Sequence, residues 1–221
     1  YCCYGLGRVQ ADEEAGKGTG KGRIMEKNLQ TIMQEIQNYQ PYNKQEENDR
    51  CVMLNLLETQ PGILERTNRV AHFSASSWIL NKEHTKVLMI YHNIYNAWAW
   101  TGGHADGDAD LMAVAYREAQ EETGVGSLKA LSDDIFSLEI LTVNGHVKRG
   151  SYVPSHLHLN VTYLFEADEE EILRVKPDEN SGVKWFSFAE ALKECSEPWM
   201  THWVYSKLMH KLEKLDHERG I

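Results

Sequence analysis

The stretch GGHADGDADLMAVAYREAQEETGV, residues 102–125, joins a glycine pair to a segment with helical periodicity. Near its end, Glu118, Glu121 and Glu122 stand at positions i, i+3 and i+4, which share one face of an α-helix. Three adjacent carboxylates repel one another, so a helix that carries them needs a partner of opposite charge. A hard divalent cation, which prefers oxygen ligands, meets this need. The stretch therefore predicts a helix with a metal-binding face.

The same segment has the features of a helix that packs on a core. Its apolar face is predicted to consist of Met112, Ala115, Tyr116 and Ala119. Asp108 or Asp110 is expected to cap the first turn, and Gly124 to end the helix. Gly102 and Gly103 have no Cβ atoms, so the backbone there is able to approach a ligand closely. The loop and the helix are thus expected to bring carbonyl oxygens and carboxylates to metal-bound phosphates.

Residues 103–125 resemble the Nudix box, whose pattern is G-x5-E-x7-R-E-U-x-E-E-x-G-U, where U is aliphatic. The positions that agree with this pattern are Gly103, Arg117, Glu118, Glu121, Glu122, Gly124 and Val125. Ala109 replaces the first glutamate of the box, and the small Ala119 occupies an aliphatic position. An ordinary acidic helix with a solvated face would explain the charges, but it would not explain a glycine pair at this distance.

The resemblance extends from about residue 71 to residue 192 and is to a bacterial Nudix subgroup. The features that carry it are the Gly-Gly-His loop at 102–104, the His-x-His segment at 156–158, and Glu179 before Val-Lys-Trp-Phe at 183–186. It implies an α/β fold, the Nudix-type α/β/α sandwich with a mixed sheet. It also implies hydrolysis of a phosphoanhydride bond in a nucleoside diphosphate-linked substrate, with Mg²⁺ or Mn²⁺ as cofactor.

The resemblance places the metal on the acidic helix face. Glu118, Glu121 and Glu122 correspond to the family's metal ligands, and the Gly103 carbonyl is a common further ligand. Mg²⁺ usually binds through a few carboxylates and phosphate oxygens, which fits this set. Arg117 is expected to brace a neighbouring carboxylate through a bidentate pair rather than to contact the substrate.

Glu179 matches a position where some family members have a further metal ligand or the general base. The alternative is a solvated loop glutamate. Gly102, Gly103 and His104 are expected to contact the substrate, and His104 could either meet a phosphate or fix the loop.

Two histidines lie on one face of a predicted strand. His156 and His158 alternate with apolar residues and are followed on the same face by Asn160 and Thr162. Such a polar face could line the substrate cleft, or its histidines could have a hydrogen-bonded structural role. A histidine pair could also bind zinc, but the sequence reveals no third ligand.

The missing box glutamate has two acidic neighbours. Ala109 cannot bind a metal or pair with Arg117, yet Asp108 and Asp110 flank it. We therefore hypothesise that one of these aspartates partly replaces the lost carboxylate.

Composition limits the classes of partner. The chain has 221 residues and a formal net charge of -10, without a dense Lys/Arg run, which argues against a nucleic-acid polymer as partner. A small, nucleotide-type anionic substrate would need a metal to screen this acidity. No apolar run approaches the ~20 residues of a membrane span, so a membrane partner is not expected. The four cysteines fit neither a zinc site nor a disulfide framework, which indicates reduced thiols and a cytoplasmic location.

The chain divides into three predicted parts. Residues 1–24 are Gly-rich and lack periodicity, and we expect a dispensable disordered leader. Residues 25–66 predict a short extension of two helices, from Met25 to Pro41 and from about Asn43 to Glu58, through which the protein could form a homodimer. Residues 67–221 predict the Nudix hydrolase domain, in which 86–93 reads as a central strand and 199–217 as a closing amphipathic helix.

Two other functions remain open. A non-catalytic Nudix-fold nucleotide-binding regulator is favoured only by Ala109. A diphosphate isomerase on the same fold would use a cysteine near the cleft, and neither Cys51 nor Cys195 falls on a strand expected there. The sequence does not identify the nucleoside diphosphate derivative.

Overall fold

The computed structural model describes residues 28–148 and 150–219. The predicted leader and the predicted helix start at Met25 lie outside the described residues. Both predicted N-terminal helices are present, as α1 (Leu29–Asn38) and α2 (Lys44–Thr59). Asn28 and Asn43 cap them, because their side chains accept hydrogen bonds from N–H groups that a helix start leaves unpaired.

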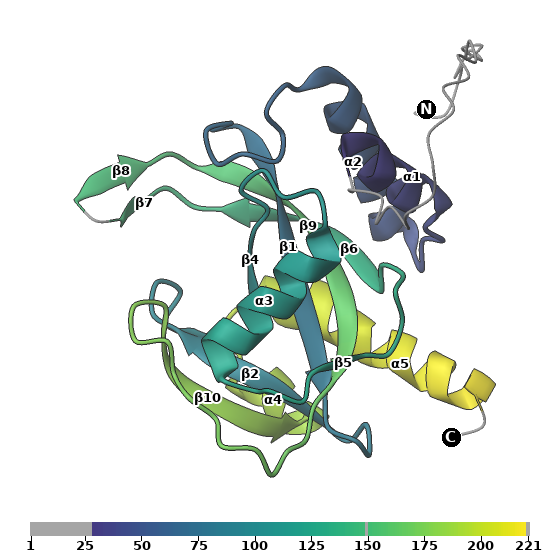
Figure 1. Ribbon diagram of the computed structural model, residues 1–221, viewed down its shortest axis with the longest axis vertical. Coiled ribbons are helices and arrows are strands. Elements are labelled where there is room, and N and C mark those ends of the chain that lie inside the picture. Colours follow the sequence, from purple (N-terminus) through teal and green to yellow (C-terminus); the bar gives the residue numbers. More distant parts are fainter. Residues whose placement is uncertain (1–27, 149, 220–221) are drawn as a thin grey trace, which may run out of the picture.

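A mixed sheet forms the centre of the molecule (Figure 1). Its eight strands are β1 (Ala71–Leu80), β2 (Lys86–His92), β3 (Ala97–Ala99), β4 (Thr101–His104), β5 (Lys129–Ala130), β6 (Ser137–Val143), β9 (His156–Glu166) and β10 (Asn180–Ser187). The order is β10-β2-β1-β9-β5, with β3 beside β2, β4 beside β1 and β6 beside β9. Of these pairs, β1 and β9 are parallel and the others antiparallel. A separate hairpin of β7 (His146–Lys148) and β8 (Ser151–Val153) extends from the body.

Helices cover both faces of the sheet, which confirms the predicted α/β/α architecture. In Figure 1, α3 (Leu111–Thr123) crosses in front of the sheet and α5 (Ser206–Arg219) passes behind it. The short α4 (Phe188–Glu194) packs with α5 on one hydrophobic cluster, while α1, α2 and α3 share another. β1 lies between the two clusters. Phe73 and Ala75 point to the first and Trp78 and Leu80 to the second, as the alternation of a strand requires.

Several elements differ from the sequence predictions. The closing helix begins with a π-helical turn, Met200–Tyr205, because Ser206 N–H bonds to Thr201 O and widens the helix. The predicted central strand at 86–93 is confirmed as β2, which lies inside the sheet between β1 and β10. On α3, Met112 and Tyr116 are only partly buried, whereas Leu111 and Val114 enter the core.

The N-terminal helices pack against the sheet. Ile32 of α1 and Met53 of α2 are fully buried in the same cluster as Phe73 of β1. Glu46 of α2 is also fully buried, and it forms ion pairs of 3.1 Å with Lys207 and with Lys211 of α5. The extension is therefore attached through both apolar and ionic contacts.

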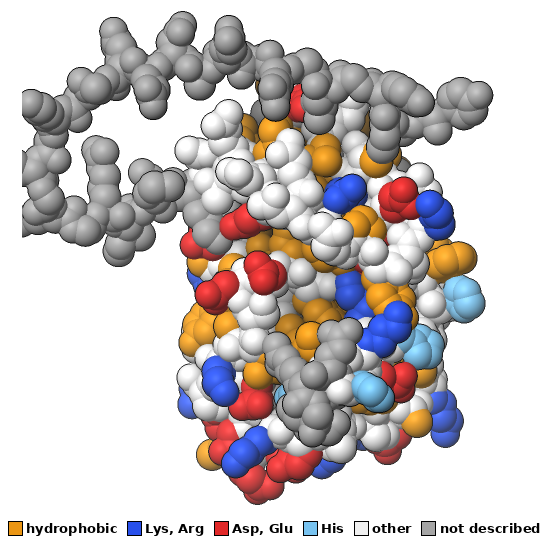
Figure 2. Space-filling view, turned by 90° about the vertical axis from the view of Figure 1, so that its right-hand side faces the viewer, with side chains coloured by type: hydrophobic (Ala, Val, Ile, Leu, Met, Phe, Trp, Pro, Cys, Tyr) orange, Lys and Arg blue, Asp and Glu red, His pale blue; other side chains and the backbone are white. Residues whose placement is uncertain are grey.

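Charges are mixed on the face that Figure 2 shows. Lys and Arg side chains are interspersed there with Asp and Glu, and hydrophobic side chains line a hollow in the middle. None of the helices within residues 28–148 and 150–219 has the length and apolar character needed to cross a membrane.

Candidate functional site

A cleft with a volume of about 590 Å³ opens where β1, β4, α3 and β9 meet the loop before β10. The predicted site residues that line it are Gly102, Gly103, His104, Glu118, Glu122, His158 and Glu179. Arg117, Glu121 and His156 lie outside this lining. Chain segments far apart in sequence thus bring most of the predicted residues together.

Glu122 is tied to the glycine loop. The backbone N–H of Gly102 donates to Glu122 Oε2 over 3.0 Å. A Cβ at Gly102 would lie 2.6 Å from Ser76 Oγ, so only glycine fits beside β1. Burial raises the pKa of the Glu122 carboxyl to about 8. A buried carboxylate with a raised pKa, facing a cleft, is typical of a functional site.

Glu118 is pressed against the second glycine. A Cβ at Gly103 would overlap the Glu118 carboxyl group, so this position also requires glycine. Burial raises the pKa of Glu118, and the neighbouring Glu121 and Glu179 add to the effect against the opposing charge of Lys176. The glycine pair therefore allows two helix carboxylates to lie directly against the backbone of β4.

Lys176, which the sequence did not single out, neutralises part of the acidic group. Its Nζ lies 2.8 Å from Glu121, 2.9 Å from Glu179 and 4.0 Å from Glu118. Partial burial acts to lower the pKa of Lys176, but the hydrogen bonds to Glu121 and Glu179 outweigh it and raise that pKa. Lys176 therefore supplies positive charge next to the carboxylates, where the sequence predicted a metal ion.

Arg117 contacts one neighbouring carboxylate, that of Asp108, through a single nitrogen rather than through two. One of its nitrogens lies 3.5 Å from Asp108, and both side chains are about half exposed. Arg117 lies outside the cleft lining, unlike the adjacent Glu118. Asp110, not Asp108, caps α3 by accepting from Ala113 N–H. Asp108 thus contacts Arg117, while Ala109 is nearly buried in the core.

The donor set fits a hard divalent cation. Glu118, Glu122 and Glu179 line one cleft together with Gly103, and all offer oxygen atoms, which Mg²⁺ and Mn²⁺ prefer. In the described part of the chain, Glu122 is hydrogen-bonded to Gly102 N–H but forms no ion pair at 4.0 Å or less. A cation would compensate this buried carboxylate and stabilise its charged form.

Positively charged side chains also line this cleft. Arg66 and Lys148 belong to the lining, and Arg66 forms a two-nitrogen pair with Asp106 in the loop after β4. Neither Arg66 nor Lys148 was predictable from the periodicity of the sequence. Trp100 also lines the cleft, whereas Trp98 packs edge-on against Phe186.

The parallel pairing of β1 and β9 extends the predicted polar face across two strands. The register aligns His72 with His158 and Ser74 with Asn160. Ser74 and Ser76 each donate to Asn160 Oδ1, over 3.1 and 2.8 Å. This network forms part of the cleft wall.

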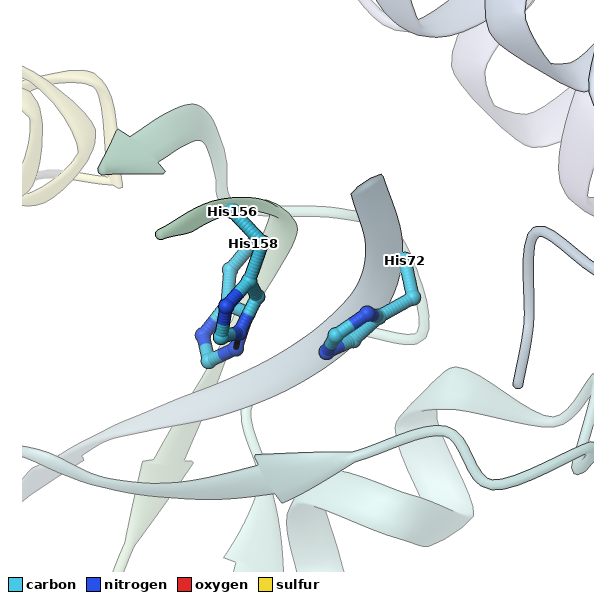
Figure 3. A group of neighbouring side chains, drawn as sticks. All are labelled: His72, His156 and His158. Carbon is cyan, nitrogen blue, oxygen red and sulfur yellow. Dashed lines mark hydrogen bonds between the residues drawn. The ribbon is translucent and has the colours of Figure 1, made fainter. Parts of the chain in front are cut away.

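Four histidine rings gather at the end of that polar face. The ring centroid of His72 lies 4.8 Å from that of His156, 5.0 Å from that of His158 and 5.1 Å from that of His104. Figure 3 shows the rings of His72, His156 and His158, which come from β1 and β9. Burial lowers the pKa of His104 to about 3, with Arg66 as the next cause, and it lowers the pKa of His158 to about 2, with the neighbouring histidines adding to the effect. His72 was missed at the sequence level, because strand register is not readable from one segment.

Comparison with known proteins gives the family. The profile of the NUDIX domain matches residues 70–207, more than half of the chain. Similar solved structures are a C. elegans Ap4A hydrolase in a binary complex (19% identity, TM-score 0.48, 65% of this chain and 96% of that one) and a NUDIX-family hydrolase from Clostridium perfringens (24%, 0.44, 65% and 97%). A MutT protein from Bacillus halodurans is also similar (19%, 0.40, 62% and 82%). The chain has no match among curated proteins.

The profile match spans the sheet, the acidic helix α3 and the cleft residues described above. The α/β/α arrangement and the position of the glycine loop against α3 agree with it. The chain therefore belongs to the NUDIX domain family and is a Nudix hydrolase.

Proposed function

We propose that this protein hydrolyses a phosphoanhydride bond in a nucleoside diphosphate-linked substrate and depends on Mg²⁺ or Mn²⁺. The observation that carries the proposal is the cleft itself. Glu118, Glu122 and Glu179 face it beside the Gly102–Gly103 backbone, while Arg66 and Lys148 line another part. Carboxylates that hold a cation and cationic groups that bind phosphate oxygens are the parts that phosphoryl transfer needs.

Each residue has a distinct part in this proposal. Glu118, Glu121, Glu122 and the Gly103 carbonyl hold the cation, which when bound supplies charge screening and activation of water. Glu121 lies outside the cleft lining and would leave its contact with Lys176 to take part.

The remaining residues act on the substrate and the proton. Glu179, at the rim beside Lys176, acts as general base or further ligand. Gly102, His104 and His158 contact the substrate, and His156 supports His158 through the 3.1 Å contact between their Nε2 atoms. Arg117 has a bracing role, with Asp108 as its partner in place of the missing box glutamate.

The test is a panel of nucleoside triphosphates, nucleotide sugars, dinucleotides and coenzymes, incubated with Mg²⁺ and assayed for the phosphorylated products of cleavage, with a phosphatase added where phosphate release is the readout. Glu121→Gln and Glu122→Gln should each lower the rate by orders of magnitude and leave the fold intact, because each removes one ligand charge. Glu170→Gln, at an exposed position outside the cleft, is the control. Full activity in both Glu121→Gln and Glu122→Gln would refute the metal assignment.

A second variant separates catalysis from binding at the rim. Glu179→Gln should lower kcat more than it raises KM if Glu179 acts on the reacting groups. An unchanged kcat would support the alternative, in which Glu179 is a solvated loop residue.

Ala109 supports one alternative, a Nudix-fold nucleotide-binding regulator without catalysis. Binding without turnover of any substrate in the panel would favour it. The isomerase alternative gains no support, because neither Cys51 nor Cys195 lines the cleft.

We also propose a domain organisation and a cellular location for this protein. The helical extension covers residues 25–66 and the Nudix hydrolase domain 67–221, in a bacterial subgroup marked by the Gly-Gly-His loop. A cytoplasmic location and a small-molecule substrate, rather than a nucleic-acid polymer or a membrane, follow from the composition. Leu29 and Val52, each 44% exposed on the extension, offer a surface for a homodimer, which light scattering would detect.

A further inference from the structure

Three histidines form a compact group of nitrogen ligands where β1 and β9 begin (Figure 3). One ring nitrogen from each of His72, His156 and His158 lies within 4.8 Å of the other two. Within residues 28–148 and 150–219, no other set of three or more His, Cys, Asp or Glu side chains gathers its ligand atoms this closely. The carboxylates of the cleft are spread around Lys176 instead.

Backbone carbonyls fix the orientation of two of these rings. His72 Nδ1 lies 2.9 Å from Asn68 O, and His156 Nδ1 lies 2.9 Å from Pro154 O. A carbonyl oxygen only accepts hydrogen bonds, so Nδ1 carries the proton in both rings and Nε2 presents a lone pair. Histidines that bind metals are oriented by the same kind of outer hydrogen bond.

The three ring nitrogens that face one another share at most one proton, so they cannot all be hydrogen-bonded among themselves. His72 Nε2 is buried without a hydrogen-bond partner. His156 Nε2 has no proton to donate once Nδ1 holds it, so its 3.1 Å contact with His158 Nε2 is a hydrogen bond only when His158 carries its proton on Nε2, and that proton is then not available to His72. A buried ring nitrogen without a partner costs free energy. A cation among the three rings would satisfy every one of these lone pairs.

We propose that His72, His156 and His158 hold a transition-metal ion of the Zn²⁺ class, at a second metal site separate from the carboxylates. Imidazole nitrogens suit Zn²⁺ and its neighbours in the first transition row, whereas Mg²⁺ prefers oxygen. A tetrahedral Zn²⁺ with Zn–N bonds of about 2.0–2.1 Å separates its nitrogens by roughly 3.3 Å, close to the contact between His156 and His158.

The fourth position of this ion is left for water. The His104 ring packs against His72 and His158 but lies outside the group of converging nitrogens. His158 also lines the cleft, so the ion sits at the border of the substrate site and links the beginnings of two adjacent strands. The ion should therefore raise the melting temperature as well.

The test uses the untagged full chain, stripped with a chelator and dialysed against Zn²⁺. Elemental analysis should find one Zn²⁺ per chain, and Zn²⁺ should raise the melting temperature. His72→Gln and His156→Gln should each weaken Zn²⁺ binding by about tenfold or more. His210→Gln, at an exposed histidine of α5, is the control and should bind like the wild type. Glu121→Gln should keep its Zn²⁺, so a failed hydrolysis assay and a failed zinc site are distinguishable.

Co²⁺ gives a readout that needs no substitution. Co²⁺ added to the stripped wild type should produce the intense visible spectrum of a tetrahedral complex with nitrogen ligands. The proposal is overturned if this spectrum is absent, or if wild type binds no more Zn²⁺ than the folded His72→Gln and His156→Gln variants, with folding checked by circular dichroism.

Discussion

Lys176 is the residue whose charge competes most directly with the proposed cation. It contacts Glu121 and Glu179 at hydrogen-bond distance and approaches Glu118. A divalent ion that binds these carboxylates must displace the ammonium group or share them with it. The affinity for the ion therefore reflects a balance between two cations.

Lys176→Met should lower the Mg²⁺ concentration for half-maximal hydrolysis, because the competing charge is gone. Partly exposed ion pairs are weak, so we expect a change of about two- to fivefold. A Mg²⁺ titration of the rate measures it, with Lys193→Met at an exposed position of α4 as control. A higher Mg²⁺ requirement in Lys176→Met would instead mean that the lysine helps to bind the substrate.

Glu122 should make the stability of the metal-free protein depend on pH. Burial raises its pKa from 4.5 to about 8, so between these values the folded chain holds a proton that the unfolded chain has lost. The free energy of unfolding contributed by this group is thus intact below about pH 4.5 and falls as pH rises toward 8. Glu122→Gln removes this contribution while its amide oxygen still accepts from Gly102.

Urea unfolding in EDTA at about pH 5 and about pH 8 measures the effect. The loss of stability over this interval should be smaller in Glu122→Gln than in wild type, and Glu121→Gln should behave like wild type. Saturating Mg²⁺ should reduce the loss in wild type, since the ion binds the charged carboxylate. An equal loss in all three proteins would show that Glu122 is not the group responsible.

At the scale of elements, periodicity was enough to predict α3 and the histidine-bearing strand β9, whereas the predicted Gly-Gly-His loop at 102–104 forms strand β4. The carboxylate spacing, the glycine pair and the polar alternation from His156 to Thr162 are all local, so one segment reveals each of them. Contacts between segments were not predictable. His72 joins His158 only through the parallel register of β1 and β9, and Lys176 reaches α3 from a loop.

The partner of Arg117 was not predictable from the helix pattern alone. Arg117 lies outside the cleft lining, and one of its nitrogens contacts Asp108, which precedes the helix. The hairpin of β7 and β8 was missed because its strands are short and carry exposed residues such as Val147 and Tyr152.

A buried ionic network fastens α2 to β6 and α5. Lys207, whose side chain is 3% exposed, lies 3.1 Å from Glu46 and 2.9 Å from Glu139, both fully buried. Burial acts to raise the pKa of Glu46, but Lys211 and Lys207 outweigh it and lower that pKa to about 2. Glu46 therefore stays charged and needs the lysines.

Lys207→Met should lower the free energy of unfolding by about 3–5 kcal/mol, because it leaves buried carboxylate charge without sufficient compensation. Urea unfolding at neutral pH measures this. Lys44→Met removes an exposed ion pair with Glu47 on the same helix and should change stability little. If the two variants lose the same stability, the network does not fasten the helices.

At the scale of the whole molecule, the N-terminal helices and the Nudix domain share one hydrophobic cluster. Ile32 and Ile36 of α1 and Met53 and Leu57 of α2 are buried with residues of β1, α3 and β9. The family match begins only at residue 70, after both helices. The chain thus completes the core of its domain with a segment that the family pattern does not include.

Truncation at two points tests this dependence. A chain starting at Met25 should melt at the same temperature as the full chain, because it keeps both helices. A chain starting at Thr67 loses the four buried side chains named above and leaves Lys207 and Glu139 without Glu46. Removing a single large buried aliphatic side chain costs about 2–5 kcal/mol, and the total stability of a domain is about 5–15 kcal/mol.

The chain starting at Thr67 should therefore fail to show a cooperative thermal transition and should bind a hydrophobic dye. Adding a peptide of residues 25–66 in excess should restore part of the transition, since the same apolar and ionic contacts would form between two molecules. If the shorter chain melts cooperatively at the temperature of the full chain, the helices are an accessory and the Nudix domain folds without them.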